Sequence, residues 1–354
     1  MGQMQLKDWT LMKVFLSATG VGAVCLGTLN TFGLATLTPK PMKLVGNIIG
    51  GSMVGIGMAI GGACPGTVFA QFGAGVNTAP WTVVGGLLGA LTYGFADPHI
   101  ADFLYQGGPA PGSPSVTLDN VFGLSFSAIA IPMGVTFIAM AYLFEYLFPS
   151  TRKPFYKALN SDQKDGSKTT LAKLSYWDPI HAGIGVGLMQ LVAQWNMGRY
   201  LSTSSAYVSF SSAILAALLL LIGQKAKVTE LSKHSYFGKH WITKLFPLWQ
   251  VCLDFGMIAG GYIGGSQSII RKQNRARKTP TVLQKVLAVV AGWILIFGAR
   301  TTMGCTSGHG ISGMAMLSVA SFISVAFNFI GGMGISAIPG LKGVLSAQYD
   351  KVNY

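Results

Sequence analysis

Charged residues are scarce in this chain, and the shortage excludes the commonest class of protein. Asp, Glu, Lys and Arg make up 10% of its 354 residues, whereas a soluble domain carries about 25%. Hydrophobic residues make up 51%, and the mean hydropathy is +0.50. A single core cannot hide this much apolar surface from water. The sequence therefore predicts an all-α polytopic membrane protein whose apolar helices are surrounded by lipid.

Acidic residues and cysteines are also few. The chain has 11 Asp and Glu against 25 Lys and Arg, a net charge of +14. The basic residues cluster in short segments between apolar runs, as the positive-inside rule requires, so the charge does not indicate nucleic-acid binding. The cysteines lie in apolar segments without CxxC spacing, so no zinc site, disulfide framework or cofactor is predicted. They are Cys25, Cys64, Cys252 and Cys305. No cleavable signal peptide is evident.

Long apolar runs are what the chain has instead. Most are close to the roughly 17–25 residues that span a bilayer. They predict about nine spanning or near-spanning segments, at 12–36, 44–61, 79–96, 118–148, 179–197, 205–223, 248–270, 281–300 and 313–338. Segments 149–178 and 224–244 are rich in Lys and are predicted to be cytoplasmic, whereas 97–117 has no Lys or Arg and is predicted on the opposite side. A plasma or inner membrane is the expected location.

Glycine is abundant, with 47 residues. It sits inside the apolar runs, where it favours close packing of helices and breaks within them. Two runs, 12–36 and 248–270, have basic residues on both flanks. A helix that crosses the membrane once should have them mainly on its cytoplasmic flank. Each holds several glycines. We therefore predict that both are re-entrant hairpins that enter and leave on one side of the membrane.

Two cysteine-bearing stretches, Gly61–Thr67 and Thr302–Gly310, follow similar apolar runs. Aligning Cys64 with Cys305 also aligns two further pairs of glycines in those runs. This similarity predicts an internal duplication within a single membrane domain, 1–354. Its parts are a first repeat, 10–96, an inserted region, 97–247, and a second repeat, 248–345. The charges leave open whether the two repeats are parallel or inverted.

Both cysteines stand where a helix is expected to stop. Pro65 disfavours helix in the residue before it, and Gly66 and Gly308 allow a close approach of the backbone to a ligand. A helix that starts inside the bilayer points free N–H groups into a cavity and attracts anions. A lone membrane cysteine is usually a small apolar filler. Two cysteines at matching positions of a repeat favour a shared path instead.

The stretches Gly55–Thr67 and Arg300–Gly313 resemble the YeeE/YedE family of sulfur-transport membrane proteins. The resemblance is strong over residues 44–75 and 285–315. It implies that cysteine thiols along a central path pass thiosulfate, or a related small sulfur anion, by S–H hydrogen bonding without enzymatic turnover. It also implies a small sulfur-carrier protein as a partner on the cytosolic side.

Cys64 and Cys305 match the motif cysteines of that family. The family has a further pathway cysteine after a phenylalanine near the N-terminus. Here Phe32 is followed by Gly33, which leaves open whether Cys25 replaces it. The candidate substrate-contacting residues are Cys64, Cys305, Gly66, Thr67, Ser307, Gly308, His309, Arg300 and Cys25.

Other polar residues in the apolar segments allow two interpretations. Arg300 either attracts the anion or extends to the membrane interface, and His309 either lines the path or is a hydrogen-bonded structural residue. Asp254 and Glu145 are interpreted as ion-pair partners of nearby basic residues. A fixed buried cation would hold a dianion too tightly for release, so the path is expected to use thiols and backbone N–H groups.

Two other functions stay open at this point. In a membrane sulfurtransferase, Cys64 or Cys305 would become a persulfide, which needs an accessible low-pKa thiolate beside a cation or a helix start. In a non-transporting subunit of a membrane complex, the scaffold would be kept without the path.

Overall fold

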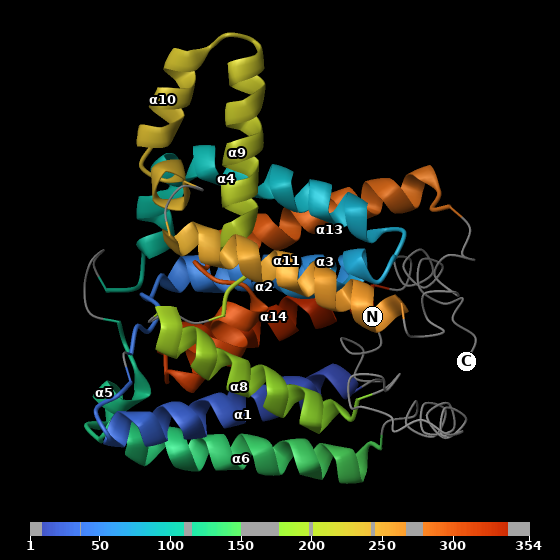
Figure 1. Ribbon diagram of the computed structural model, residues 1–354. Coiled ribbons are helices and arrows are strands. Elements are labelled where there is room, and N and C mark those ends of the chain that lie inside the picture. The colour runs from blue at the N-terminus through green and yellow to red at the C-terminus, as the bar shows by residue number, and fades with distance from the viewer. Residues whose placement is uncertain are drawn as a thin grey trace.

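The computed structural model describes residues 9–35, 37–109, 115–149, 177–197, 201–241, 245–266 and 279–338. Within these ranges the secondary-structure elements are helices, joined by turns and loops. The one β-type pairing in the described residues is an isolated antiparallel bridge between Thr117 and Ser318. The all-α prediction is confirmed (Figure 1). The elements are α1 (Thr10–Thr31), α2 (Leu44–Gly61), α3 (Pro65–Gly73), α4 (Ala79–Tyr105), α5 (Leu118–Phe122), α6 (Phe126–Leu147), α8 (Pro179–Met197), α9 (Ser204–Leu221), α10 (Lys225–Lys233), the 3₁₀ helix η2 (Phe237–His240), α11 (Leu245–Ser266), α13 (Val282–Thr301), the π-helix η3 (Ser307–Gly313) and α14 (Val319–Ala337).

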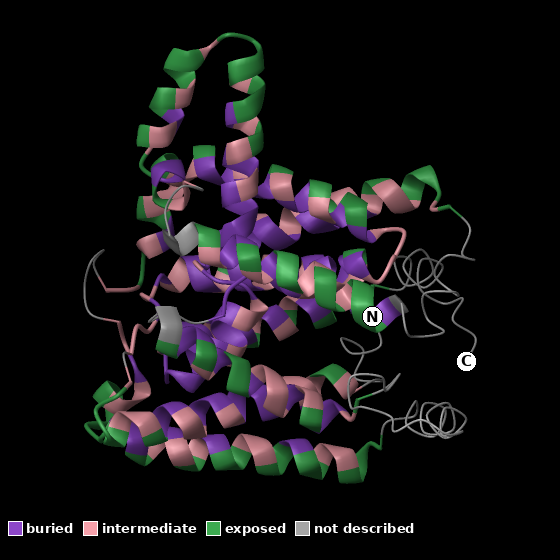
Figure 2. Cartoon of the chain, in the orientation of Figure 1, coloured by how far each residue is buried: buried purple, intermediate pink, exposed green. Residues whose placement is uncertain are grey.

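Each of the nine predicted apolar segments contains a long helix. Six stretches of the described chain are long and apolar enough to cross a membrane, judged by length and composition, namely Thr10–Thr31, Leu44–Gly73, Phe126–Leu147, Ser204–Leu221, Val282–Thr301 and Val319–Ala337. Many large apolar side chains on these helices are exposed, and α6 is exposed along much of its length (Figure 2). Such a surface suits lipid and not water. The chain is therefore an integral, multi-pass membrane protein.

Local chemistry explains where several helices begin and end. Thr281 starts α13 through a capping box, in which its hydroxyl accepts a hydrogen bond from Gln284 N and the Gln284 side chain accepts one from Thr281 N. This exchange satisfies donors that the first turn leaves free. Gly62 ends α2 in the left-handed conformation, with φ of 69°, which glycine adopts without steric cost.

The predicted re-entrant hairpins are wrong, because α1 and α11 are continuous helices of 22 residues each. Their glycines allow close contact with a neighbouring helix. A Cβ on Gly20 would lie 2.7 Å from Gly134 O on α6, and one on Gly261 would collide with Ala70 O on α3. Residues 267–270 of the second predicted hairpin lie outside the described residues. In these two segments glycine serves helix packing and not chain reversal.

The packing of residues 224–241 favours a different side from the one predicted for segment 224–244, whose residues 242–244 lie outside the described residues. This segment packs against the C-terminal half of α4, where the Phe95 ring lies 5.1 Å from the Phe237 ring and 6.2 Å from the His234 ring. It therefore lies at the same end of the molecule as the segment that follows α4. The sequence prediction counted α9 as a crossing. In Figure 1, α9 runs across the other long helices and α10 returns beside it.

Helices α2 and α13 form the centre of the molecule (Figure 2). They are antiparallel, since Gly50 approaches Gly298 and Gly57 approaches Leu295. The helices around them pack reciprocally. Helix α2 packs along α14 as α13 packs along α4, and α3 packs on α11 as η3 packs on α1.

Two copies of one unit that run in opposite directions would generate this reciprocal pattern. The packing therefore favours an inverted arrangement of the two predicted repeats. Their boundaries, 10–96 and 248–345, stay a prediction.

The packing of residues 224–241 on α4 predicts which positions share a side of the membrane. Cysteines introduced at the exposed Gln106 and Ser235 should react with an impermeant thiol reagent from one side, and a cysteine at the exposed Thr281 should react from the other. Helix α13 runs parallel to α4, so Thr281 and Gln106 lie at opposite ends. Labelling of intact and permeabilised vesicles measures this. Reaction of Gln106→Cys and Ser235→Cys from opposite sides would contradict the arrangement.

Candidate functional site

The first cysteine break joins α2 to α3. After Gly62 the chain becomes extended, with Cys64 at φ −81° and ψ 166°, and α3 starts at Pro65. Cys64 caps this helix: Thr67 N donates to Cys64 Sγ at 3.4 Å, and Cys64 N donates to Thr67 Oγ1 at 2.7 Å. The thiol therefore stands at the positive end of a nine-residue helix. The prediction that a helix stops at Cys64 is confirmed.

The second break, between α13 and η3, repeats this geometry. Met303 is left-handed with φ of 62°, and it stands two residues before Cys305 as Gly62 stands two residues before Cys64. A non-glycine residue in this conformation costs roughly 1–3 kcal/mol. Hydrogen bonds hold the turn, from Gly304 N to Ala299 O at 2.8 Å and from Thr302 Oγ1 to Gly304 O at 2.6 Å.

Hydroxyl groups surround the sulfur of Cys305, which is 1% exposed. Its Sγ lies 3.1 Å from Ser307 Oγ, 3.5 Å from Thr203 Oγ1 and 4.0 Å from Ser202 Oγ. The side chains of Ser202 and Thr203 come from the segment that leads into α9. This segment lies in the centre of the molecule, and α9 runs outward from there (Figure 1).

Thr203 lies between the two breaks. Besides its contact with Cys305, its Cγ2 would lie 3.1 Å from a Cβ on Gly66. It also occupies the N-cap position of α9, without a capping hydrogen bond from its side chain, so the positive end of an 18-residue helix lies here as well. The neighbouring Ser204 Oγ is buried without a hydrogen-bond partner. The run Ser202–Ser205 before an apolar stretch is a helix-start signal, and it would have identified this segment from sequence.

The two breaks share one neighbourhood. Ala63, beside Cys64, belongs to the same buried cluster as Cys305. Thr306 Oγ1 donates to Met58 Sδ on α2 at 3.1 Å, and the two cysteines lie within electrostatic reach of each other. The structure therefore brings together six of the candidate residues, which are Cys64, Gly66, Thr67, Cys305, Ser307 and Gly308.

Arg300 does not extend to the membrane interface, so that interpretation is wrong. Its side chain is buried, and it donates hydrogen bonds to Tyr236 Oη at 2.5 Å and Ser205 Oγ at 2.8 Å. His240 Nε2 lies 3.2 Å from the guanidinium. These contacts link the end of α13 to the start of α9 through Ser205 and to η2 through Tyr236 and His240. Arg300 thus reaches the site through Ser205 and contributes its electric field there.

His309 is buried, and both of its ring nitrogens have hydrogen-bond partners. Its Nε2 lies 2.8 Å from Thr302 O and its Nδ1 lies 2.9 Å from Ser321 Oγ. Since a carbonyl only accepts, Nε2 donates to it and Nδ1 accepts from the serine. Both ring nitrogens are thus engaged, and the ring ties the second break to α14. An anion would have to displace one of these bonds to reach the imidazole.

Cys25 lies elsewhere. It is half-buried on α1, beside a cluster formed by Ala23, Leu26 and the residues that follow η3. Among the contacts of the described residues, none connects Cys25 with Cys64 or Cys305. Cys252 is exposed on α11.

Lys40 is a site residue that the sequence interpretation missed. It is 6% exposed, and its Nζ donates to Met303 O at 2.6 Å. It also approaches Gly308, where an added Cβ would lie 3.6 Å from Nζ. Burial lowers the pKa of Lys40 to about 8; Cys305 opposes this shift and Arg300 adds to it. The expectation that no buried cation stands near the path is therefore wrong. Between Pro39 and Pro41, this lysine had the pattern of an ordinary loop residue.

The predictions for the two acidic residues, Glu145 and Asp254, have different outcomes. Glu145 accepts a hydrogen bond from the buried Lys13 Nζ at 2.6 Å, an ion pair that joins α6 to α1. Its ion-pair role is confirmed, but the partner is Lys13 and not a basic residue nearby in the sequence, and Arg152 and Lys153 lie outside the described residues. Asp254 was expected to pair at the interface, and this is wrong because Asp254 is fully buried and its carboxylate oxygens have no hydrogen-bond partner.

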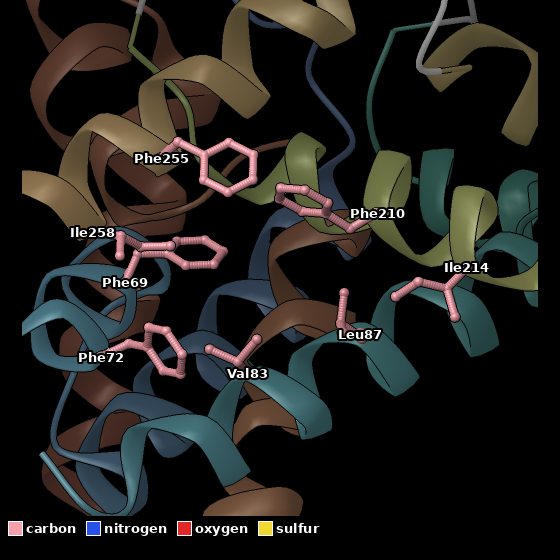
Figure 3. A pocket seen from close by; sticks show the side chains of 8 residues that line it. All are labelled: Phe69, Phe72, Val83, Leu87, Phe210, Ile214, Phe255 and Ile258. Atoms are coloured by element: carbon pink, nitrogen blue, oxygen red, sulfur yellow. The ribbon is translucent and has the colours of Figure 1, made fainter. Parts of the chain in front are cut away.

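A pocket of about 210 Å³ opens beside α3, but it does not suit an anion (Figure 3). Its lining is entirely apolar, formed by Phe69, Phe72, Val83, Leu87, Phe210, Ile214, Phe255 and Ile258. An anion placed there would lose its hydration without gaining a donor. Within the described ranges, no group of three or more His, Cys, Asp or Glu residues is placed to hold a metal ion.

Comparisons with known proteins agree on one family. The family model described as "Sulphur transport" matches residues 2–334. The thiosulfate transporter TsuA of Spirochaeta thermophila is 24% identical over 338 residues, 92% of this chain and 87% of that protein. TsuA of Escherichia coli is 23% identical over 337 residues, 92% of this chain and 83% of that protein. A probable transporter of Xylella fastidiosa is 42% identical over 53 residues, 15% of this chain and 39% of that protein.

Proposed function

The chain belongs to the sulphur transport family, and on that premise we propose that it moves thiosulfate across the membrane past Cys64 and Cys305. One observation carries the proposal: two cysteine-bearing helix breaks meet at the buried polar start of α9. Two relatives that align over most of their length are named thiosulfate transporters. Their names support the substrate, and the polar groups around Cys305 suit it chemically.

Thiosulfate is a dianion with a soft terminal sulfur, and it must exchange its water shell for protein donors. The site offers S–H groups, the hydroxyls of Ser202, Thr203 and Ser307, and backbone N–H groups at the starts of α3 and α9. Each of these donors binds an anion weakly. A path of weak donors favours both entry and release.

Lys40 supplies long-range attraction without a tight ion pair. Its ammonium is already bound to Met303 O, so it can remain there while its charge stabilises an anion beside Cys305. This arrangement reconciles a buried cation with release of the substrate. The small sulfur-carrier partner is part of the proposal through the family resemblance alone.

A path with two thiols is the form that we propose. The position after Phe32 holds Gly33, where an added side chain would meet open space. Cys25 is half-buried on α1, and no hydrogen bond among the described residues joins it to either break. A sulfurtransferase reaction is less well supported, because Cys305 is almost fully buried and His309 and Arg300 are engaged by other partners. An acceptor protein could not reach the Cys305 sulfur directly.

The cysteines give the first test. Cys305→Ala and Cys64→Ala should each reduce uptake of labelled thiosulfate into proteoliposomes by about ten- to a hundredfold, because a lost hydrogen bond to a charged group is worth roughly 1.5–3 kcal/mol. Cys252→Ala is the matched control and should transport normally, and so should Cys25→Ala. Normal transport by both Cys64→Ala and Cys305→Ala would refute the proposal. Added sulfur on either cysteine in the intact mass would favour the sulfurtransferase.

The charge of Lys40 gives the second test. Its pKa of about 8 means that the ammonium is present below this pH and is lost as the pH rises through it. Uptake should therefore fall between neutral and alkaline pH. Lys40→Arg should keep uptake at alkaline pH, because a guanidinium does not titrate there, whereas Lys40→Met should be low throughout, on the order of tenfold. The same alkaline fall in Lys40→Arg as in the native chain would exclude Lys40 as its cause.

A further inference from the structure

Asp254 is a buried acid that the transport path described so far does not use. It lies on α11, is fully buried, and neither carboxylate oxygen has a hydrogen-bond partner. An unpaired carboxylate away from water is strongly unfavourable. Binding of a proton removes that cost.

The position of α11 places this acid beside the cysteine breaks. Helix α11 packs along α3, and Met257 Cε would lie 2.9 Å from a Cβ on Gly66. Asp254 itself lies within electrostatic reach of Cys305 and of Tyr207 on α9. The Tyr207 hydroxyl in turn donates to Pro65 O at 3.2 Å. The carboxyl group thus belongs to the same buried region as the two thiols.

No cation in the described part of the chain is paired with Asp254. The titratable groups that face it are the Tyr207 hydroxyl from α9 and the Cys305 thiol from the second break, with Cys64 beyond them at the start of α3. On α11 itself, Cys252 and Tyr262 are exposed. A negative charge that enters this region therefore acts on the carboxyl group, and the charges of Lys40 and Arg300 near Cys305 partly oppose this effect.

We propose that Asp254 is a proton-binding site that fills together with the anion site, so that thiosulfate crosses the membrane with a proton. This inference rests on the proposed function. A dianion at the cysteines disfavours a second negative charge nearby, which stabilises the protonated acid. By linkage, the protonated acid raises the affinity for the anion.

The proton balance is simple. A proton from the solution on the entry side binds a carboxylate oxygen of Asp254, and it leaves to the solution on the exit side after the anion departs. The loaded protein then carries one negative charge fewer through the membrane field. Protonation therefore lowers the electrical cost of importing a dianion.

Proton movement with thiosulfate is the first measurement. The full chain is placed in proteoliposomes that contain a pH-sensitive dye, with both solutions at or below neutral pH so that Lys40 stays charged. Thiosulfate added outside should acidify the lumen, and an acidic exterior should speed uptake several-fold. Asp254→Asn should lose both responses. Asp102→Asn, which removes an exposed carboxylate on α4, should keep them.

Two results would overturn the proton site: thiosulfate uptake by the native chain without acidification, or a native-like response of Asp254→Asn. Infrared spectroscopy separates this failure from failure of the proposed function. The native protein should show a carbonyl band of a protonated acid that Asp254→Asn lacks and that grows when thiosulfate is added. Absence of that band refutes the proton site whatever the transport result. No thiosulfate uptake by the native chain refutes the proposed function.

Discussion

Backbone groups that are freed where a helix stops inside a membrane must find partners, and this constraint organises the whole structure. Helices α2 and α13 both stop near the centre, at Gly61 and Thr301. At the first stop, the cap formed by Cys64 and Thr67 supplies the partners. At the second stop, Lys40 supplies one of them by donating to Met303 O. The side chains that bond to the free backbone groups at the two breaks are thus the same groups that could bind an anion.

Local chemistry made the breaks predictable from the sequence, whereas the role of most glycines was not. Pro65 and Gly62 act on their own neighbours in the chain, so the end of α2 follows from sequence alone. The glycines of α1 and α11 act on other helices. Gly20 faces Gly134, and Gly261 faces Ala70. In a single sequence, a glycine that ends a helix cannot be distinguished from one that lets two helices pack closely.

The candidate site was predictable to the same extent. The motif cysteines and their immediate followers were identified because their spacing is specific. Thr203 and Lys40 were missed because segments far away in the sequence bring them to Cys305. The two functions offered for Arg300 could be separated only when its partners, Tyr236 and Ser205, were known. Contacts between distant segments therefore decide which polar groups face the path.

The central claim is that the two breaks form one anion site, and a structure with a heavier substrate tests it most directly. Selenosulfate, the selenium analogue of thiosulfate, can be located by its anomalous signal in crystals of the full chain. We predict a selenium position between Cys64 Sγ and Cys305 Sγ, beside Thr203. Selenium bound only elsewhere, such as in the apolar pocket beside α3, with the region between the cysteines empty, would contradict the account.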